Sequence, residues 1–219
     1  RGSFGMVWAG NLAPGGGSVV VKEVDCSSPM AHAAAEFQGE VLRLCCSWSD
    51  EEVARLPRLL AMEILKGLAV GVGAQRMLLV MARLPGEPFD NFLARAQPGM
   101  GEPCHQLLQA TSFAKLLLNQ LSSALSWLAK RSVLHRGVHP QNVLIEDHGE
   151  GRPVRFGLVD FGEAADFGLW RQGQWRDRSV GGDCRYWPTS SWVFFCLGAE
   201  ALDEALRWEY EERLDLHAL

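Results

Sequence analysis

The first third of the chain carries apolar residues in short, strand-sized groups. Residues 5–9 and 18–24 predict two strands joined by the glycine-rich turn at 14–17, and the second of them is rich in β-branched valine. Residues 77–81 predict another buried strand. Residues 30–46 instead place their apolar side chains at helical spacing on one face. We therefore expect a β-rich region with one inserted helix.

The remainder of the chain has mainly helical periodicity. Residues 113–131 carry a stripe of leucines three and four positions apart, which predicts a long amphipathic helix. Short strands are expected at 143–145 and 156–159, and residues 162–195 form an irregular stretch rich in Gly, Arg and Trp. Leu84-Pro85-Gly86 interrupts the pattern. The sequence thus predicts an α+β protein with a β-rich domain at 1–84 and a larger helical domain at 85–219.

Composition narrows the classes of partner and compartment. The 219 residues are 47% hydrophobic and 21% charged, as in an ordinary globular protein, and the net charge of −5 provides no basic field for nucleic acid. No apolar run is long enough to cross a bilayer, so no membrane partner is expected. The six cysteines form no Cys-x-x-Cys pair and have no zinc-like spacing. We expect reduced thiols in a cytoplasmic or nuclear protein.

Two features of the β-rich region suggest phosphate binding. Residues 2–7 form a glycine-containing turn before a strand, where backbone N–H groups can approach phosphates closely, although such turns are common. Lys22 ends an apolar strand, and a buried ammonium group requires a partner. Glu40, on the predicted helix, can provide one. The alternative for Lys22 is an ordinary surface lysine at a strand end.

Two oxygen-bearing side chains lie beside short strands of the second region. Asn142 precedes the strand at 143–145, and Asp160 follows the strand at 156–159. Amide and carboxylate oxygens are ligands that Mg²⁺ prefers. We therefore expect Asn142 and Asp160 to face one cleft and to bind a metal ion.

The order and spacing of these elements resemble the protein kinase family over nearly the whole chain. The resemblance implies a two-lobed fold that binds ATP and Mg²⁺, with Lys22 paired to Glu40 and the metal held by Asn142 and Asp160. It implies the following nucleotide-binding residues: Gly2, Ser3, Phe4, Gly5, Val7, Val20, Lys22, Met81, Leu84 and Leu144.

The later part of the chain extends the resemblance. Residues 182–188 resemble the end of a kinase activation segment, and residues 214–219 resemble the start of the helix after it. The first glycine of the phosphate loop would precede Arg1, so we expect a kinase-like fold truncated at both ends. Arg136 is a candidate for binding a phosphate on Ser179, Thr189 or Ser190, or a simple brace of its loop. Trp170, Trp175, Trp187 and Trp192 predict packing beneath an insertion or, alternatively, a docking surface.

The sequence departs from the family where phosphoryl transfer requires a carboxylate. The family loop reads His-Arg-Asp-x-Lys-Pro-x-Asn, but here Gly137 replaces the Asp and His139 replaces the Lys. The Asp accepts the proton of the acceptor hydroxyl, which glycine cannot do. The Ala-Pro-Glu sequence that normally follows is also eroded, because Pro188-Thr189-Ser190 occupies that stretch. We expect an ATP-binding pseudokinase with impaired phosphoryl transfer, acting in signalling or scaffolding with a protein substrate or regulatory partner.

Two alternatives stay open on the sequence. His139 is a possible substitute base at this catalytic position, which would make the protein a weakly active serine/threonine-type kinase and leaves the enzyme question undecided. His139-Pro140-Gln141-Asn142 also resembles small-molecule phosphotransferases of the aminoglycoside and choline kinase type. Those enzymes carry an Asp at the position of Gly137 too, so the defect would remain.

Overall fold

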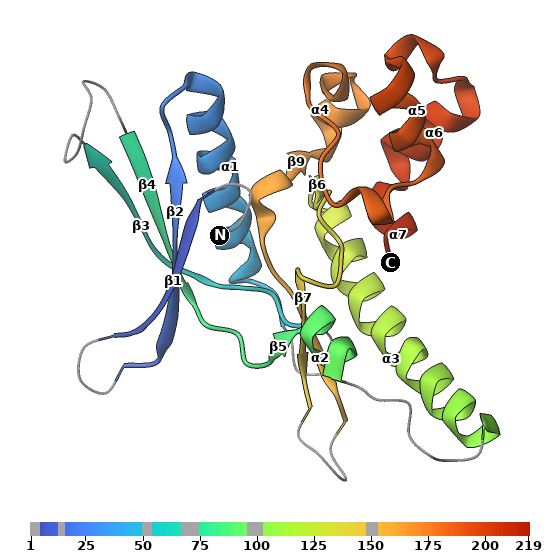
Figure 1. Ribbon diagram of the computed structural model, residues 1–219. Helices are drawn as coiled ribbons and strands as arrows, with labels where there is room; N and C mark the ends of the chain where they lie inside the picture. Colours follow the sequence, from blue (N-terminus) through green and yellow to red (C-terminus); the bar gives the residue numbers. More distant parts are fainter. Residues whose placement is uncertain (1–4, 13–15, 50–53, 67–74, 96–102, 148–152) are drawn as a thin grey trace. The chain divides into compact units, whose positions relative to one another are not determined.

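The computed structural model describes residues 5–12, 16–49, 54–66, 75–95, 103–147 and 153–219, so the predicted Gly2, Ser3 and Phe4 lie outside the described residues. The chain forms two compact units, which are coloured by sequence in Figure 1. The first unit comprises Arg1–Ser49 and Leu56–Leu84, and the second comprises Asp50–Arg55 and Pro85–Leu219.

The first unit is a four-stranded antiparallel sheet with the strand order β1-β2-β4-β3, accompanied by helix α1 (Figure 1). Its elements are β1 (Met6–Asn11), β2 (Ser18–Asp25), α1 (Pro29–Cys45), β3 (Leu59–Lys66) and β4 (Gln75–Ala82). The strands and the helix predicted in this region are confirmed, but β3 was not predicted. Its sequence, Leu-Leu-Ala-Met-Glu-Ile-Leu-Lys, has no strict alternation of apolar and polar residues, and its pairing with β4 is irregular between Leu59 and Ala61.

Helix α1 begins where its sequence supplies a cap. The Ser28 hydroxyl accepts a hydrogen bond from the Ala31 N–H at 3.1 Å, and Pro29 occupies the first helical position, where no N–H is needed. Ala35, Gln38, Gly39, Val41, Leu42 and Cys45 form the buried side of the helix. These residues recur mainly at spacings of three and four, and the side of the helix that they form packs against β2 and β3.

The second unit begins with a small sheet and a long helix. Strands β5 (Glu87–Pro88), β7 (Val143–Glu146) and β8 (Arg155–Leu158) form an antiparallel sheet in the order β5-β7-β8, and α2 (Phe89–Arg95) follows β5. Helix α3 (Pro103–Ala129) is anchored to the sheet through Gln120. The Gln120 side chain donates to the Val154 carbonyl at 3.0 Å and accepts from the Phe156 N–H at 2.9 Å. Strands β6 (Val133–Leu134) and β9 (Ala165–Asp166) pair separately.

The predicted irregular stretch and the residues after it contain short helices around an aromatic core. The helices are η1 (Phe161–Glu163), α4 (Phe167–Arg171), η2 (Gln174–Asp177), η3 (Cys184–Tyr186), α5 (Thr189–Leu197), η4 (Ala199–Ala201), α6 (Glu204–Glu212) and α7 (Leu214–His217). Trp170, Trp175 and Tyr210 are almost fully buried at the centre of this core. Packing is therefore the role of these two tryptophans. None of the helices in the described parts has the length and apolarity needed to cross a membrane.

Candidate functional site

The register of the first sheet brings several predicted nucleotide-binding residues onto one face. Val7 pairs with Lys22 across β1 and β2, and Val20 pairs with Met81 across β2 and β4. Directly opposed residues project to the same side, and alternate residues of a strand share a side, so these four side chains share a face. Gly5 lies directly before β1, where a β-carbon would collide with the Glu23 carbonyl.

The helix residue that reaches Lys22 differs from the predicted one. The Lys22 ammonium is almost fully buried and donates to Gln38 Oε1 at 3.5 Å, whereas Glu40 is exposed. Positions 38 and 40 are about 200° apart around a helix axis, so both cannot face the sheet. The prediction that Glu40 is the partner is therefore wrong in register. Because Gln38 is neutral, this contact lacks the charge of a lysine–glutamate pair.

The second unit places the two predicted metal ligands at one end of a hairpin. Strands β7 and β8 pair antiparallel with Val143 opposite Leu158, so the residue before β7 and those after β8 lie at the same end. The Val159 N–H donates to the Asn142 carbonyl at 2.9 Å, which extends the pairing toward Asp160. Leu144 lies on β7, in this unit, whereas Leu84 ends the first unit.

Asp160 has an uncommon backbone conformation. Its φ is +64°, which non-glycine residues seldom adopt, and its Oδ1 accepts from the Gly162 N–H at 3.1 Å. The next residue, Phe161, is buried against the His135 ring, with 4.7 Å between the centroids. The side chain of Asp160 is thus oriented by its own turn and by the packing of its neighbour.

The loop at 135–142 is held in place by the carboxylate of Asp215, a residue that the sequence prediction did not assign to the site. Asp215, on α7, accepts from the His135 N–H and from the Arg136 N–H, both at 2.7 Å. The carboxylate is buried, and burial raises the pKa of Asp215 while the two backbone donors oppose that rise. Helix α7 therefore connects the end of the described chain to the centre of the loop.

Gly137 retains the surroundings of a structured loop. Its N–H donates to His135 Nδ1 at 3.1 Å, and its carbonyl accepts from Asn142 Nδ2 at 2.9 Å. Burial lowers the pKa of His135, which keeps the ring neutral and able to accept this bond. The loop at 137 thus lacks a side chain, while the backbone contacts are intact.

The Asn142 amide determines the state of His139. Asn142 Nδ2 lies 3.0 Å from His139 Nε2 and also donates to the Gly137 carbonyl, so its two hydrogens have two acceptors. His139 Nε2 then accepts, and the proton of the neutral ring is on Nδ1. Burial lowers the pKa of His139, with Asp183 the foremost of the carboxylates opposing the decrease. At neutral pH the position therefore carries no positive charge, unlike a lysine.

Arg136 is engaged by the protein itself. Its guanidinium donates to the Ser179 carbonyl at 2.6 Å and to the Glu163 carbonyl at 3.3 Å, and lies 4.5 Å from the centroid of the Trp170 ring. Ser190, one of the candidate phosphate acceptors, is fully buried in α5. These contacts support the prediction that Arg136 braces its loop.

The segment before η3 passes very close to the loop. Gly182 has a φ of +79°, and a β-carbon there would lie 2.6 Å from the Arg136 carbonyl oxygen and 3.9 Å from Gly137 Cα. Only glycine allows this approach. The segment and the loop are therefore in backbone contact at the position where the side chain is missing.

Replacing Gly182 with alanine is expected to lower the free energy of unfolding by about 1–3 kcal/mol. The strain of a positive φ in a non-glycine residue and the collision of the new β-carbon with the Arg136 carbonyl both contribute to this cost. Urea unfolding followed by tryptophan fluorescence would measure this. Gly198 is a matched control, since its φ is +86° but a β-carbon there would have no neighbour within 4 Å. An equal cost for Gly198→Ala would show that the close approach to Arg136 contributes nothing.

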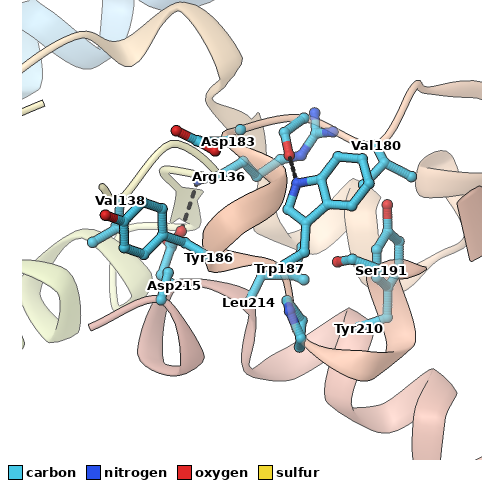
Figure 2. A pocket seen from close by; sticks show the side chains of 14 residues that line it. Arg136, Val138, Val180, Asp183, Tyr186, Trp187, Ser191, Tyr210, Leu214 and Asp215 are labelled. Carbon is cyan, nitrogen blue, oxygen red and sulfur yellow. Dashed lines mark hydrogen bonds between the residues drawn. The ribbon is translucent and has the colours of Figure 1, made fainter. Parts of the chain in front are cut away.

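A pocket lies between the loop, the 180–188 segment and α7 (Figure 2). Arg136, Val138, Asp183, Tyr186, Trp187 and Asp215 are among the residues that line it. It has room for about two water molecules, so it is too small for a nucleotide. Trp187 closes one side by donating from Nε1 to the Gly181 carbonyl at 2.8 Å.

Comparison with known proteins identifies the family that this sequence resembles. The model of the family described as protein tyrosine and serine/threonine kinase matches residues 1–193. CBL-interacting protein kinase 4 of Oryza sativa subsp. japonica is 34% identical over 159 residues, which are 73% of this chain and 31% of that protein.

Two further relatives agree. The L-type lectin-domain containing receptor kinase I.3 of Arabidopsis thaliana is 27% identical over 164 residues, or 74% of this chain and 21% of that protein. Cyclin-dependent kinase 14 of Callithrix jacchus is 50% identical over 45 residues, or 20% of this chain and 11% of that protein. The chain thus spans less than a third of the length of these relatives. On the strength of the family match across most of its length, the chain belongs to the protein tyrosine and serine/threonine kinase family.

Proposed function

We propose that this kinase domain binds ATP with Mg²⁺ and transfers the γ-phosphoryl group poorly. The observation that carries the proposal is Gly137 in the loop at 135–142, which we call the catalytic loop. Its backbone keeps the hydrogen bonds of this loop, but it lacks the aspartate carboxylate of the family. General base catalysis contributes about 10²–10⁴-fold to a rate. Its loss impairs the chemical step without removing the residues proposed to bind the nucleotide.

The chemistry of the donor set fits a magnesium ion. Both hydrogens of the Asn142 amide are directed at Gly137 and His139, so the amide oxygen points elsewhere and is available as a ligand. Asp160 supplies a carboxylate oriented by its own turn. We propose that these two residues hold Mg²⁺, which would neutralise phosphate charge.

The first unit supplies the proposed nucleotide contacts. Val7, Val20 and Met81 share a sheet face with Lys22, whose ammonium would bind phosphate oxygens. Gly5 and Leu84 belong to the same unit, whereas Leu144, on β7 of the second unit, stays a prediction from the family resemblance. The Lys22 ammonium also donates to the neutral Gln38 side chain of α1 at 3.5 Å.

A neutral His139 adds to the proposed defect. The family's lysine at this position holds a γ-phosphate oxygen through its charge, whereas a ring whose pKa is lowered by burial has none to offer at neutral pH. Because both the base and this cation are missing, we propose a role in signalling or scaffolding, in which ATP favours a conformation that a protein partner recognises. Cys26, Cys45, Cys46, Cys184 and Cys196 are free thiols, which supports a reducing cytoplasmic or nuclear location.

The second candidate is a weakly active protein kinase. It is favoured by the intact hydrogen bonding around Gly137, since positioning and electrostatics provide most of the catalysis in phosphoryl transfer. His139 could act as the base only if Asn142 released its Nε2. The family match supports a protein, rather than a small molecule, as acceptor or partner.

Addition of Mg²⁺ and ATP at about 100 times the dissociation constant is expected to stabilise the protein by about 2.7 kcal/mol. This corresponds to a rise in melting temperature of roughly 5–10 °C. Differential scanning fluorimetry would measure it. Asp160→Asn should reduce the magnesium-dependent part, whereas Asp177→Asn, at an exposed site in η2, should retain the full shift. A folded protein with no shift would refute nucleotide binding.

A further inference from the structure

The chain contains an acidic side chain that can act in place of the one missing at position 137. Three of the carboxylates near the catalytic loop already have other roles. Asp215 is buried beneath two backbone N–H groups, Glu163 faces Arg136, and Asp160 is the proposed metal ligand. Asp183, in the activation segment, has none of these roles and remains partly exposed, with 20% of its side chain accessible.

The backbone brings the turn that contains Asp183 close to Gly137. Gly182 comes so close to the catalytic loop that its α-carbon has room for no side chain against the Arg136 carbonyl and Gly137 Cα. Asp183 follows directly and lines the same pocket as Arg136 and Val138, the two neighbours of Gly137 (Figure 2). Three residues later, the Tyr186 ring stacks on His139 with 6.3 Å between centroids. Contacts on both sides of Asp183 thus hold this turn against the loop.

The charge of Asp183 is maintained by its own turn. The carboxylate accepts from Arg185 Nη2 at 2.5 Å, from Arg185 Nε at 3.0 Å and from the Arg185 N–H at 3.0 Å. The Arg185 side-chain bonds lower the pKa of Asp183, so it is ionised at neutral pH. Arg185 Nε also lies 3.1 Å from Asp183 Oδ1, so four hydrogen bonds reach the carboxylate, and a substrate hydroxyl would have to replace one that comes from the exposed Arg185 side chain.

We propose that Asp183 replaces the missing catalytic aspartate for the residual phosphoryl transfer of this domain, as the acceptor of the substrate hydroxyl proton. This inference rests on the proposed function, in which ATP is the phosphoryl donor. The hydroxyl oxygen of the protein substrate forms a bond to the γ-phosphorus, and the bond from that phosphorus to the β,γ-bridging oxygen breaks, with its electron pair leaving on ADP. The hydroxyl proton passes to the Asp183 carboxylate and then to solvent.

The role predicts a slow rate. Because Arg185 holds the carboxylate and lowers its pKa, Asp183 is a weaker base than an unpaired aspartate. Phosphoryl transfer through a loose transition state needs a positioned acceptor more than a strong one. Asp183 therefore supports transfer well below the rate of a kinase with an aspartate at position 137.

The test compares Asp183→Asn with Asp177→Asn, an exposed aspartate on the same segment. Asparagine retains an oxygen for the Arg185 N–H, so the turn should fold. The assay measures the rate of transfer from γ-labelled ATP to a generic protein substrate, and the rate of Asp160→Asn is subtracted as background. This rate should decrease about 10-fold or more in Asp183→Asn and be unchanged in Asp177→Asn. Thermal stabilisation by Mg²⁺ and ATP should be the same in both variants.

A double variant separates catalysis from structure. In a Gly137→Asp background, Asp183→Asn should lose its effect on transfer, since the catalytic carboxylate is then present elsewhere. A merely structural Asp183 would reduce the rate in both backgrounds.

The outcomes distinguish the inference from the proposed function. Nucleotide stabilisation without measurable transfer, or transfer that is insensitive to Asp183→Asn, overturns the role of Asp183 and leaves ATP binding in place. Absence of nucleotide stabilisation overturns the proposed function itself. Loss of transfer in Asp183→Asn that persists in the Gly137→Asp background also contradicts the inference.

Discussion

Gly137→Asp is expected to raise the rate of phosphoryl transfer by roughly 100-fold or more, toward the 10²–10⁴-fold that a positioned general base contributes. The variant restores the group that accepts the hydroxyl proton in this family. A gain of this size lowers the activation free energy by about 3 kcal/mol or more. Transfer from γ-labelled ATP to a protein substrate would measure it, with thermal stabilisation by Mg²⁺ and ATP reporting nucleotide binding separately.

The backbone at position 137 can accept the new side chain. A β-carbon there would lie 3.3 Å from Asn142 Nδ2 and 3.5 Å from the nearest His135 ring atoms, so the Asn142 amide has to move by only a few tenths of an ångström. At Gly182, by contrast, the obstacle is a backbone oxygen at 2.6 Å and φ is positive. Gly137 is therefore the one of these two glycines that the fold allows to be replaced.

Gly137→Asn is the matched control, because it has nearly the shape of aspartate but cannot take up the proton. It should leave the rate near that of the unmodified protein. If Gly137→Asp folds and binds ATP yet transfers no faster, the defect lies elsewhere, with the neutral His139 as the first alternative. A lysine there, in a Gly137→Asp and His139→Lys double variant, would test that explanation directly.

The sequence was sufficient for those elements whose hydrophobic period is clear. Residues 30–46 and 113–131 have helical spacing and are helical, and the valine-rich strand at 18–24 is β2. Strand β3 could not be predicted, because its register against β4 is irregular and its apolar residues do not alternate. The short helices after Phe161 are built around Trp170 and Trp175, and their packing depends on contacts distant in sequence.

The site was predictable to the extent that its residues are adjacent in sequence or flank strands. The ends of β7 and β8 place Asn142 and Asp160 together because antiparallel pairing requires it. The Lys22 partner was assigned two residues away from Gln38, since the buried side of α1 is defined by packing on the sheet. The sequence related residues 182–188 and 214–219 to the family, but it did not place Asp183 and Asp215 near the loop, because they lie 46 and 78 residues beyond Gly137 and are brought there by the tertiary fold.

Asp215→Ala is expected to destabilise the second unit by about 3–5 kcal/mol, because two buried N–H groups lose their acceptor and each unsatisfied donor costs about 1–3 kcal/mol. The donors are the amides of His135 and Arg136, both 2.7 Å from the carboxylate. Urea unfolding followed by tryptophan fluorescence would report it, since Trp170 and Trp175 are buried in this unit.

Asp203 provides the matched control for Asp215. Its carboxylate also accepts from a backbone N–H, that of Leu206 at 2.8 Å, but as the exposed cap of α6. Asp203→Ala should therefore cost only about 1 kcal/mol, because water can satisfy the freed donor. The cost of Asp215→Asn should lie between these two values. The amide oxygen of asparagine can accept from one of the two backbone N–H groups, but its NH₂ group is itself a donor and cannot accept from the other. If Asp215→Ala cost no more than Asp203→Ala, the geometry of the catalytic loop would have to be maintained without α7.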